Sequence, residues 1–248
     1  MSTAITTILT VPFWHASATA AAAAICARAA KQKAPIQVVT LNAEMAVFAS
    51  DTDAAAAAIL SADFFVADSI AVVLACRTAG RAATRIPGID LASLLTASTS
   101  TTPTRVALVG GLSDVVRERA KKSIEARGSI VVYATQGPPN IILENSQFEP
   151  WFHEIAAAQP DLILLALGHG KQEWWGSELK KVLNFSTIII GVGGTLDVWG
   201  GASRRAPRFM RAIGIEWLWR LLTEPRRLRR IITATVVFPF RVLRGYLV

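Results

Sequence analysis

The sequence predicts a Rossmann-like α/β fold, in which a mostly parallel sheet has helices on both faces and an arginine-rich helical appendage follows at the C-terminus. Short, continuously apolar segments alternate with helical segments along the chain, as in parallel sheets that are buried on both faces. Hydrophobic residues make up 52% of the 248 residues and charged residues 18%, which suits a sizeable core and excludes wholesale disorder. Positive charge gathers near the C-terminus, which sets that part of the chain apart.

The N-terminal elements follow from local composition. An alanine-rich stretch predicts a helix over residues 15–32, and the apolar run that follows predicts a strand over residues 36–41. A second alanine run predicts a helix over residues 54–60. A short strand is expected over residues 64–67, and an apolar helix from about residue 70.

The C-terminal half of the body continues the same alternation. A strand over residues 105–109 stops at two glycines, and a helix is expected from Ser113, which is a favourable N-cap residue. Fully apolar runs predict strands over residues 130–133 and 162–167. The last helix and the last strand of the body are expected over residues 174–183 and 187–190.

Polar residues and glycines that directly follow strands are the candidates for a site, because ligands bind beyond the carboxyl ends of parallel strands. The glycine pairs 110–111 and 193–194 are turns that let a phosphate approach backbone N–H groups, although a tight strand-to-helix turn has the same composition. Neither completes the dinucleotide-binding pattern G-x-G-x-x-G, because residue 196 is Leu. A dinucleotide dehydrogenase is therefore disfavoured.

Asp68 ends the buried strand 64–67, and no Lys or Arg lies within eight residues of it. A carboxylate beside apolar walls can have a raised pKa and act as a general base. It can equally be the N-cap of the helix that follows, and spacing alone does not choose between these interpretations. Gln172, after the strand 162–167, is likewise either an exposed amide or a group that grips a sugar or phosphate.

Asp51-x-Asp53 has the form of a carboxylate pair that holds a divalent cation and a sugar-nucleotide donor. The pair lies directly before an alanine run, however, so we expect these residues to cap that helix. Three histidines and two cysteines are scattered along the chain, which argues against a zinc site and a disulfide framework. We expect no metal and no cofactor.

The basic tail is the strongest single feature of the sequence. Residues 204–248 contain eleven arginines and two acidic residues, whereas residues 1–203 contain 15 basic and 16 acidic residues. Arg204, Arg208 and Arg211 are expected to share one helix face, and Trp217 and Trp219 follow. Arginine beside tryptophan suits an anionic membrane surface, a diphosphate or single-stranded nucleic acid. We predict a catalytic domain over residues 1–203 and a basic appendage over residues 204–248.

Several motifs, taken together and in their order, resemble the WecG/TagA/CpsF family of bacterial glycosyltransferases over residues 36–231. They are Thr40-Leu-Asn42-Ala-Glu44-Met45, Ala67-Asp68, Arg85-x-x-Gly88-x-Asp90-Leu91, Leu167-Gly168-x-x-Lys171-Gln172-Glu173, Gly191-Val-Gly193-Gly194-x-x-Asp197-x-x-Gly200-Gly201, Arg205-Ala206-Pro207 and Glu216-Trp217-x-x-Arg220-Leu-x-x-Glu224-Pro225-x-Arg227. Two positions depart from the family pattern: Ser69 stands where Gly is usual, and Gly170 where Pro is usual.

The resemblance implies an inverting, metal-independent enzyme that moves a sugar from a UDP donor to a polyprenyl-diphosphate-linked saccharide in envelope or exopolysaccharide synthesis. It implies that the enzyme is cytoplasmic and peripheral on the inner face of the cytoplasmic membrane. It places the general base at Asp68. The substrate contacts are expected at Thr40, Asn42, Arg85, Gln172, Arg220, Arg227 and Arg230. We assign the donor nucleotide to Gly110, Gly111, Gly193, Gly194 and Asp197.

Two alternatives from other classes remain: a non-catalytic membrane-surface protein with an inert body, and a nucleic-acid-binding module. Polar residues gathered at strand ends of a nearly neutral body favour the enzyme. The expected partners are therefore a UDP-sugar, a polyprenyl-diphosphate-linked acceptor and an anionic membrane surface, with no nucleic acid. The sequence leaves open a homo-oligomer and whether the sugar is a hexose, a hexosamine or a hexosaminuronic acid.

Overall fold

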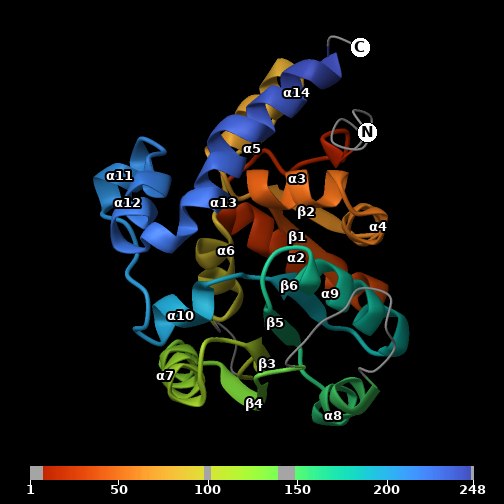
Figure 1. Cartoon of the computed structure of the whole chain (residues 1–248). Helices are drawn as coiled ribbons and strands as arrows, with labels where there is room; N and C mark the ends of the chain where they lie inside the picture. Colours follow the sequence, from red (N-terminus) through yellow and green to blue (C-terminus); the bar gives the residue numbers. More distant parts are fainter. Residues whose placement is uncertain (1–7, 98–101, 139–148, 247–248) are drawn as a thin grey trace.

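The computed structural model of the chain describes residues 8–97, 102–138 and 149–246. Its six strands form one sheet in which every neighbouring pair is parallel (Figure 1). The strands are β1 (Ile36–Leu41), β2 (Phe64–Ala67), β3 (Arg105–Gly110), β4 (Ile130–Thr135), β5 (Leu162–Ala166) and β6 (Ile188–Gly191), in the order β2-β1-β6-β5-β3-β4. The predicted fold class and all six predicted strands are confirmed.

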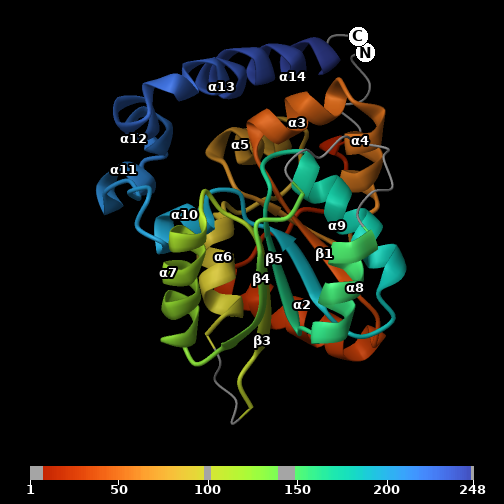
Figure 2. The ribbon, with the colours of Figure 1, turned by 60° about the horizontal axis from the view of Figure 1, so that its bottom comes forward.

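Helices cover both faces of the sheet (Figure 2). One face packs against α2 (Ala18–Gln32), α6 (Gly88–Leu95) and α7 (Asp114–Glu125), and the other against α4 (Asp53–Leu60), α8 (Glu149–Ala158) and α9 (Lys171–Val182). Successive residues of a strand alternate between the two layers, as Val106 and Ala107 of β3 do. A further cluster lies under α3 (Ala43–Ser50) and α5 (Ile70–Thr78).

Among the described residues, four helices lie where the sequence analysis expects none: α3, α6, α8 and α10 (Thr195–Trp199). α3 is buried over most of its surface, so it lacks the polar face that makes a helix recognisable.

The presence of α3 also corrects the expectation that Asp51 and Asp53 cap the helix that follows them. Asp51 ends α3 and pairs with Arg241 (2.6 Å), whereas the N-cap of α4 is Thr52, which makes no side-chain cap bond. Asp53 lies in the first turn of α4.

The basic tail folds as a series of helical segments that ends in one long rod (Figure 2). The segments are α11 (Arg208–Ala212), α12 (Glu216–Thr223), η1 (Pro225–Arg227), α13 (Leu228–Ile232), the π-helical η2 (Thr233–Val237) and α14 (Phe238–Tyr246). The wide turn of η2 contains Thr235, four residues before Pro239. In a regular α-helix the ring of Pro239 would clash with the carbonyl group of that residue. The rod, which consists of α13, η2 and α14, therefore continues as a helix through Pro239.

Arg204 does not join Arg208 and Arg211 on one helix face, contrary to the sequence-based expectation. Pro207 is the N-cap of α11, so the helix begins only at Arg208. In the described part of the chain, no helix combines the length and the apolar character that crossing a bilayer requires.

The rod of the tail packs onto the body through one of its faces. Phe238 and Val242 are buried in the same hydrophobic cluster as Met45 and Val73 of the body. α14 contacts both α3 and α5. The division of the chain at residue 203 stays a prediction, but the stability of the two parts is coupled through this shared core.

Replacing Phe238 by Ala should lower the free energy of unfolding by about 3–5 kcal/mol, because the side chain is only 1% exposed and its loss leaves a cavity. Phe240 is 63% exposed, so Phe240→Ala is the matched control and should change stability little. Urea denaturation of both variants checks the expectation. Equal effects from the two substitutions would mean that the tail does not pack on the body as described.

Candidate active site

A cavity of about 530 Å³ lies beyond the carboxyl ends of β1, β2, β5 and β6, a size typical of small-molecule sites. The predicted site residues that line it are Thr40, Asn42, Asp68, Arg85, Gln172, Gly193, Gly194, Asp197, Arg220, Arg227 and Arg230. The tail thus contributes one wall and the strand ends of the body the other.

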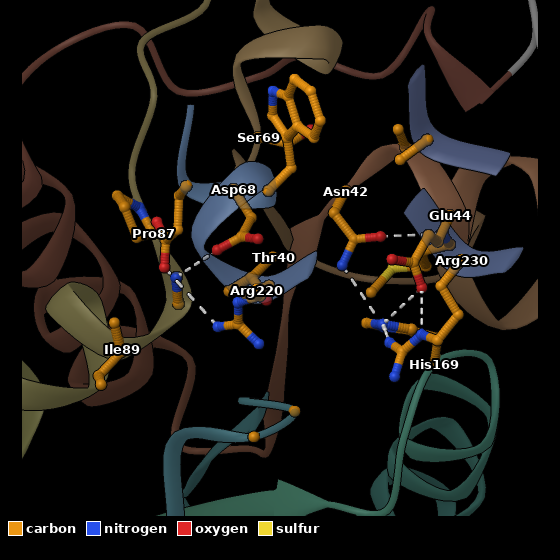
Figure 3. Close-up of a pocket in the computed structure, with 18 of the residues that line it drawn as sticks. Thr40, Asn42, Glu44, Asp68, Ser69, Pro87, Ile89, His169, Arg220 and Arg230 are labelled. Carbon is orange, nitrogen blue, oxygen red and sulfur yellow. Dashed lines mark hydrogen bonds and ion pairs between the residues drawn. The ribbon is translucent and has the colours of Figure 1, made fainter. Parts of the chain in front are cut away.

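Asp68 follows the last residue of β2 and faces the cavity (Figure 3). Its Oδ1 accepts a hydrogen bond from the Gly88 N–H (2.7 Å), and Oδ2 has no hydrogen-bond partner among the described residues. Ser69, not Asp68, is the N-cap of α5, because its Oγ accepts the Val72 N–H (3.4 Å). The capping interpretation of Asp68 is therefore wrong, and one of its carboxylate oxygens is free for a ligand.

The surroundings of Asp68 favour its protonated form relative to an exposed carboxyl. Burial is the main cause that raises the pKa of Asp68, and the negative charge of Glu216 acts in the same direction. The Gly88 N–H, Arg85 and Arg220 oppose this shift. A carboxylate with a raised pKa is a stronger base than an ordinary one, so this group suits proton abstraction.

Arg85 joins the body to the tail. Its Nε donates to the Asp68 carbonyl (3.2 Å), its Nη1 to the Arg211 carbonyl (2.7 Å) and its Nη2 to Glu216 Oε2 (2.9 Å). These bonds tie the end of β2 to α11 and α12. Each of the three nitrogens of Arg85 already has a protein acceptor, so the side chain links the body to the tail. The substrate contact expected of Arg85 stays a prediction.

Thr40 and Gln172 hold the turn between β6 and α10. The Thr40 hydroxyl donates to the Gly191 carbonyl (2.9 Å), and Gln172 Oε1 accepts the Gly193 N–H (3.1 Å). Gln172 is buried, and its Nε2 donates to Glu173 Oε1 (2.6 Å). A Cβ atom at position 191 would lie 2.5 Å from Gln172 Nε2, which explains the glycine there. Both side chains therefore act through the turn that lines the cavity; their direct substrate contacts stay predictions.

The loop between β5 and α9 has a backbone that requires glycine. Gly168 and Gly170 have φ values of +89° and +75°, and a Cβ atom at Gly170 would lie 2.0 Å from Phe48 Cε1. Proline, with φ fixed near −65°, does not fit this conformation. Glu173 Oε2 accepts the Gly170 N–H (2.7 Å), and burial raises the pKa of Glu173. The departure from the family pattern at position 170 thus has a local cause.

A second polar cluster faces Asp68 across the cavity and contains Asn42, Glu44, His169 and Arg230 (Figure 3). Asn42 caps α3 through its Oδ1, which accepts the Met45 N–H (2.9 Å), so its amide nitrogen faces His169 Nδ1 (3.4 Å). The other ring nitrogen, Nε2, lies 3.3 Å from Glu44 Oε2. This network fixes which way the imidazole ring points into the cavity.

Arg230 reaches from α13 to this cluster. Its Nε donates to Glu44 Oε2 (2.7 Å), and its guanidinium group also contacts His169 Nε2. Hydrogen bonds and positive charge from His169 and Arg230 outweigh burial and lower the pKa of Glu44. Sequence reasoning named Glu44 only within a motif and gave His169 no role. The signal for both was their place three residues after the end of a strand, β1 for Glu44 and β5 for His169.

Two further tail arginines of the cavity, Arg220 and Arg227, are held by acidic residues of the tail itself. Arg227 Nε donates to Glu224 Oε2 (2.5 Å), and Arg220 lies 3.7 Å from Glu216 Oε1. Figure 3 shows Arg220 next to Asp68. The cavity therefore combines a basic carboxylate with several guanidinium groups, which can remove a proton on one side and bind an anion on the other.

Gly110 and Gly111 do not line the cavity. A Cβ atom at Gly110 would lie 2.4 Å from the Ala166 carbonyl oxygen, so close packing against β5 accounts for that glycine. The turn is still linked to the cavity, because Asp197 Oδ1 accepts the Leu112 N–H (3.0 Å). Burial raises the pKa of Asp197, and Arg227 opposes the shift. Nucleotide binding by these residues stays a prediction.

Metal ligands are not grouped in the described ranges, where no three His, Cys, Asp or Glu side chains come together as a candidate site.

A comparison with models of known protein families matches residues 6–248 to the family described as "Glycosyl transferase WecG/TagA/CpsF family". The match covers nearly the whole chain, tail included.

Proposed function

The chain belongs to the WecG/TagA/CpsF family of glycosyl transferases, and from that premise we propose that it moves a sugar from a UDP donor to a polyprenyl-diphosphate-linked acceptor with inversion at the anomeric carbon. The family makes the chain a transferase of cell-envelope polysaccharide biosynthesis. Membership of a transferase family argues against both non-catalytic alternatives, the membrane-surface protein and the nucleic-acid-binding module. The donor, the acceptor and the stereochemistry are the proposal, and the observation that carries it is the placement of Asp68.

The reaction we propose is a single displacement. Asp68 Oδ2 takes the proton of the acceptor hydroxyl as that oxygen attacks the anomeric carbon from the face opposite the diphosphate. The bond between the anomeric carbon and the diphosphate oxygen breaks, and its electron pair leaves with UDP. One displacement from the opposite face inverts the configuration, and no covalent enzyme intermediate forms.

The departing diphosphate needs positive charge as it leaves. Arg220, Arg227 and Arg230 line the same cavity as Asp68 and can supply that charge. One guanidinium group can donate two parallel hydrogen bonds to two oxygens of a phosphate. This bidentate contact balances the charge of the phosphate and also fixes its orientation. The proposed mechanism therefore needs no metal ion.

The rate should depend on pH through Asp68. A general base works only when it is deprotonated, and the pKa of this group lies above its ordinary value. We expect kcat/KM to rise with pH and to level off above a pKa higher than the ~3.9 of an exposed Asp. A pH–rate profile of the wild-type enzyme tests this. A profile that is flat down to the acid limit of stability would contradict it.

The exposed face of the tail rod supports peripheral membrane binding. Its large apolar side chains recur at helical spacing opposite the buried face, at Ile232, Val236, Phe240 and Leu243. An apolar row on a helix rich in arginine suits the interface of an anionic membrane. We therefore propose that the enzyme acts at the inner face of the cytoplasmic membrane. The exposed apolar row on the rod and the proposed lipid-linked acceptor both support this location.

Changing Phe240 and Leu243 together to Ser should weaken binding to phosphatidylglycerol vesicles roughly tenfold or more. Fully burying either side chain contributes about 1.5–3 kcal/mol, and about 1.4 kcal/mol corresponds to tenfold in affinity. Vesicle sedimentation measures the change. Val115 and Val182 are exposed on α7 and α9, so their double change to Ser is the control. Equal vesicle binding by both double variants would remove the membrane role of the rod.

A donor screen tests the proposed function as a whole. The purified full chain is incubated with a panel of UDP-sugars and a short-chain polyprenyl-diphosphate acceptor, with and without EDTA, and the products are identified by mass. We expect one sugar to be transferred at the same rate in EDTA. If activity disappears with EDTA and returns with Mg²⁺ or Mn²⁺, the reaction depends on a metal and the metal-independent mechanism is wrong.

A further inference from the structure

A second cavity, of about 370 Å³, adjoins the candidate active site. Its lining consists of Arg85, Pro87, Asp90, Arg205, Arg208 and Arg211. Arg85, Pro87 and Arg205 line both cavities, but Asp68 lines only the first. The second cavity lies between the start of α6 and α11, and α11 lies beside α12 at one edge of the molecule (Figure 2).

The charges around the second cavity are not balanced. Asp90 Oδ2 pairs with Arg205 Nη2 (2.7 Å). All three nitrogens of the Arg85 guanidinium group donate to acceptors of the body and the tail. Arg211 donates through Nε to the Ala206 carbonyl (3.0 Å). Arg208 is exposed and has no hydrogen-bond or ion-pair partner in the part of the chain that the structure describes. Arg205, Arg208 and Arg211 thus face a single carboxylate.

Arg205 also carries an unsatisfied donor. Its Nε is buried and finds no acceptor among the described residues. A buried N–H group without a partner is unfavourable, and native proteins seldom leave one. A ligand oxygen beside Arg205 would satisfy it.

We propose that Arg205, Arg208 and Arg211 form a binding site for phosphate beside the cavity of Asp68, with Arg205 in the wall that the two cavities share. The three guanidinium groups and the one carboxylate leave two positive charges without a partner. A ligand with a single carboxylate would balance only one of them, whereas two phosphate charges would balance both. The planar guanidinium group also binds phosphate oxygens in pairs. Two sources carry this chemistry: the head groups of an anionic lipid surface, and the diphosphate of a lipid-linked acceptor. The second source rests on the proposed function.

Titration of the full chain with inorganic pyrophosphate, followed by calorimetry, tests the site without any sugar transfer. Changing Arg208 and Arg211 together to Gln should weaken pyrophosphate binding at the second cavity at least about tenfold, as expected for the loss of two charge-assisted contacts. Binding at the first cavity, to which the proposed function assigns a diphosphate, should be retained. Arg119 is exposed on α7 and lines neither cavity, so Arg119→Gln should bind as the wild type does. Thermal melting shows whether each variant is folded.

A third variant separates the two cavities. Changing Arg227 and Arg230 to Gln alters only the first cavity, so pyrophosphate should still bind at the second. Unchanged binding in the Arg208 and Arg211 variant, or complete loss of binding in the Arg227 and Arg230 variant, overturns the proposal. Neither result depends on whether the chain transfers a sugar, so the failure of the proposed function is a separate finding.

Two further measurements distinguish the sources of phosphate. If lipid head groups are the ligand, the Arg208 and Arg211 variant binds phosphatidylglycerol vesicles at least about fivefold more weakly than the Arg119 control does. If the acceptor diphosphate is the ligand, vesicle binding is equal in both variants, and KM for a soluble diphosphate acceptor rises in the Arg208 and Arg211 variant while kcat is retained. An unchanged result in both measurements counts against the site.

Discussion

Replacing Asp68 by Asn is expected to reduce turnover by about two to four orders of magnitude, the range that general base catalysis contributes. The amide has the shape of the carboxyl group, and its oxygen can still accept the Gly88 N–H, so the fold should survive. The side chain then cannot take a proton from the acceptor hydroxyl. Single-turnover kinetics at saturating donor and acceptor measure the loss directly.

Asp51→Asn is the matched control for that experiment. Asp51 pairs with Arg241 outside the cavity, and with Asp53 it forms the carboxylate pair whose spacing resembles a divalent-cation site. We expect Asp51→Asn to keep near-normal turnover. Near-normal turnover in Asp68→Asn would contradict the mechanism, and a severe loss in Asp51→Asn would reopen the metal-dependent alternative.

Changing Arg220, Arg227 and Arg230 together to Ala should lower kcat/KM for a soluble acceptor by about 10²–10³ or more, because removing even one donor to a developing anion costs that much in well-studied enzymes. A soluble acceptor removes the contribution of membrane binding. The expected loss therefore reports on the diphosphate alone.

The tail offers a control with the same change of charge. Arg226, Arg229 and Arg244 are exposed and do not line the cavity, so their triple change to Ala removes three positive charges away from the diphosphate. This control should keep most of its activity on the soluble acceptor. Equal losses in the two triple variants would assign the arginines to general electrostatics, and the proposed contact with the leaving group would have to be withdrawn.

The strands were predictable because a buried parallel strand is a continuous apolar run, and its ends are marked by polar or glycine residues. The order of the strands was not predictable from local sequence. β6 lies between β1 and β5, a placement that depends on contacts between segments far apart in the chain. The helix α3 was missed because burial removes the polar stripe that identifies a longer helix. The helix α10 was missed because its five residues are too few to show a helical period.

The candidate site was predictable where one strand end carries it, as at Asp68. The cluster of Glu44, His169 and Arg230 was not, because Arg230 meets Glu44 across 186 positions of the sequence. Only the fold of the tail brings them together. For the same reason, the burial of Phe238 against the body was not visible in a tail read as a basic appendage.

The central claim, a single displacement with Asp68 as the base, is tested most directly by the configuration of the product. The sugar is transferred from an α-linked UDP donor in the presence of EDTA, and the anomeric proton of the first product is observed by NMR before any further reaction. We predict a β-linked product, inverted relative to the donor. An α-linked product would require two displacements or attack from the same face, and it would contradict the role assigned to Asp68.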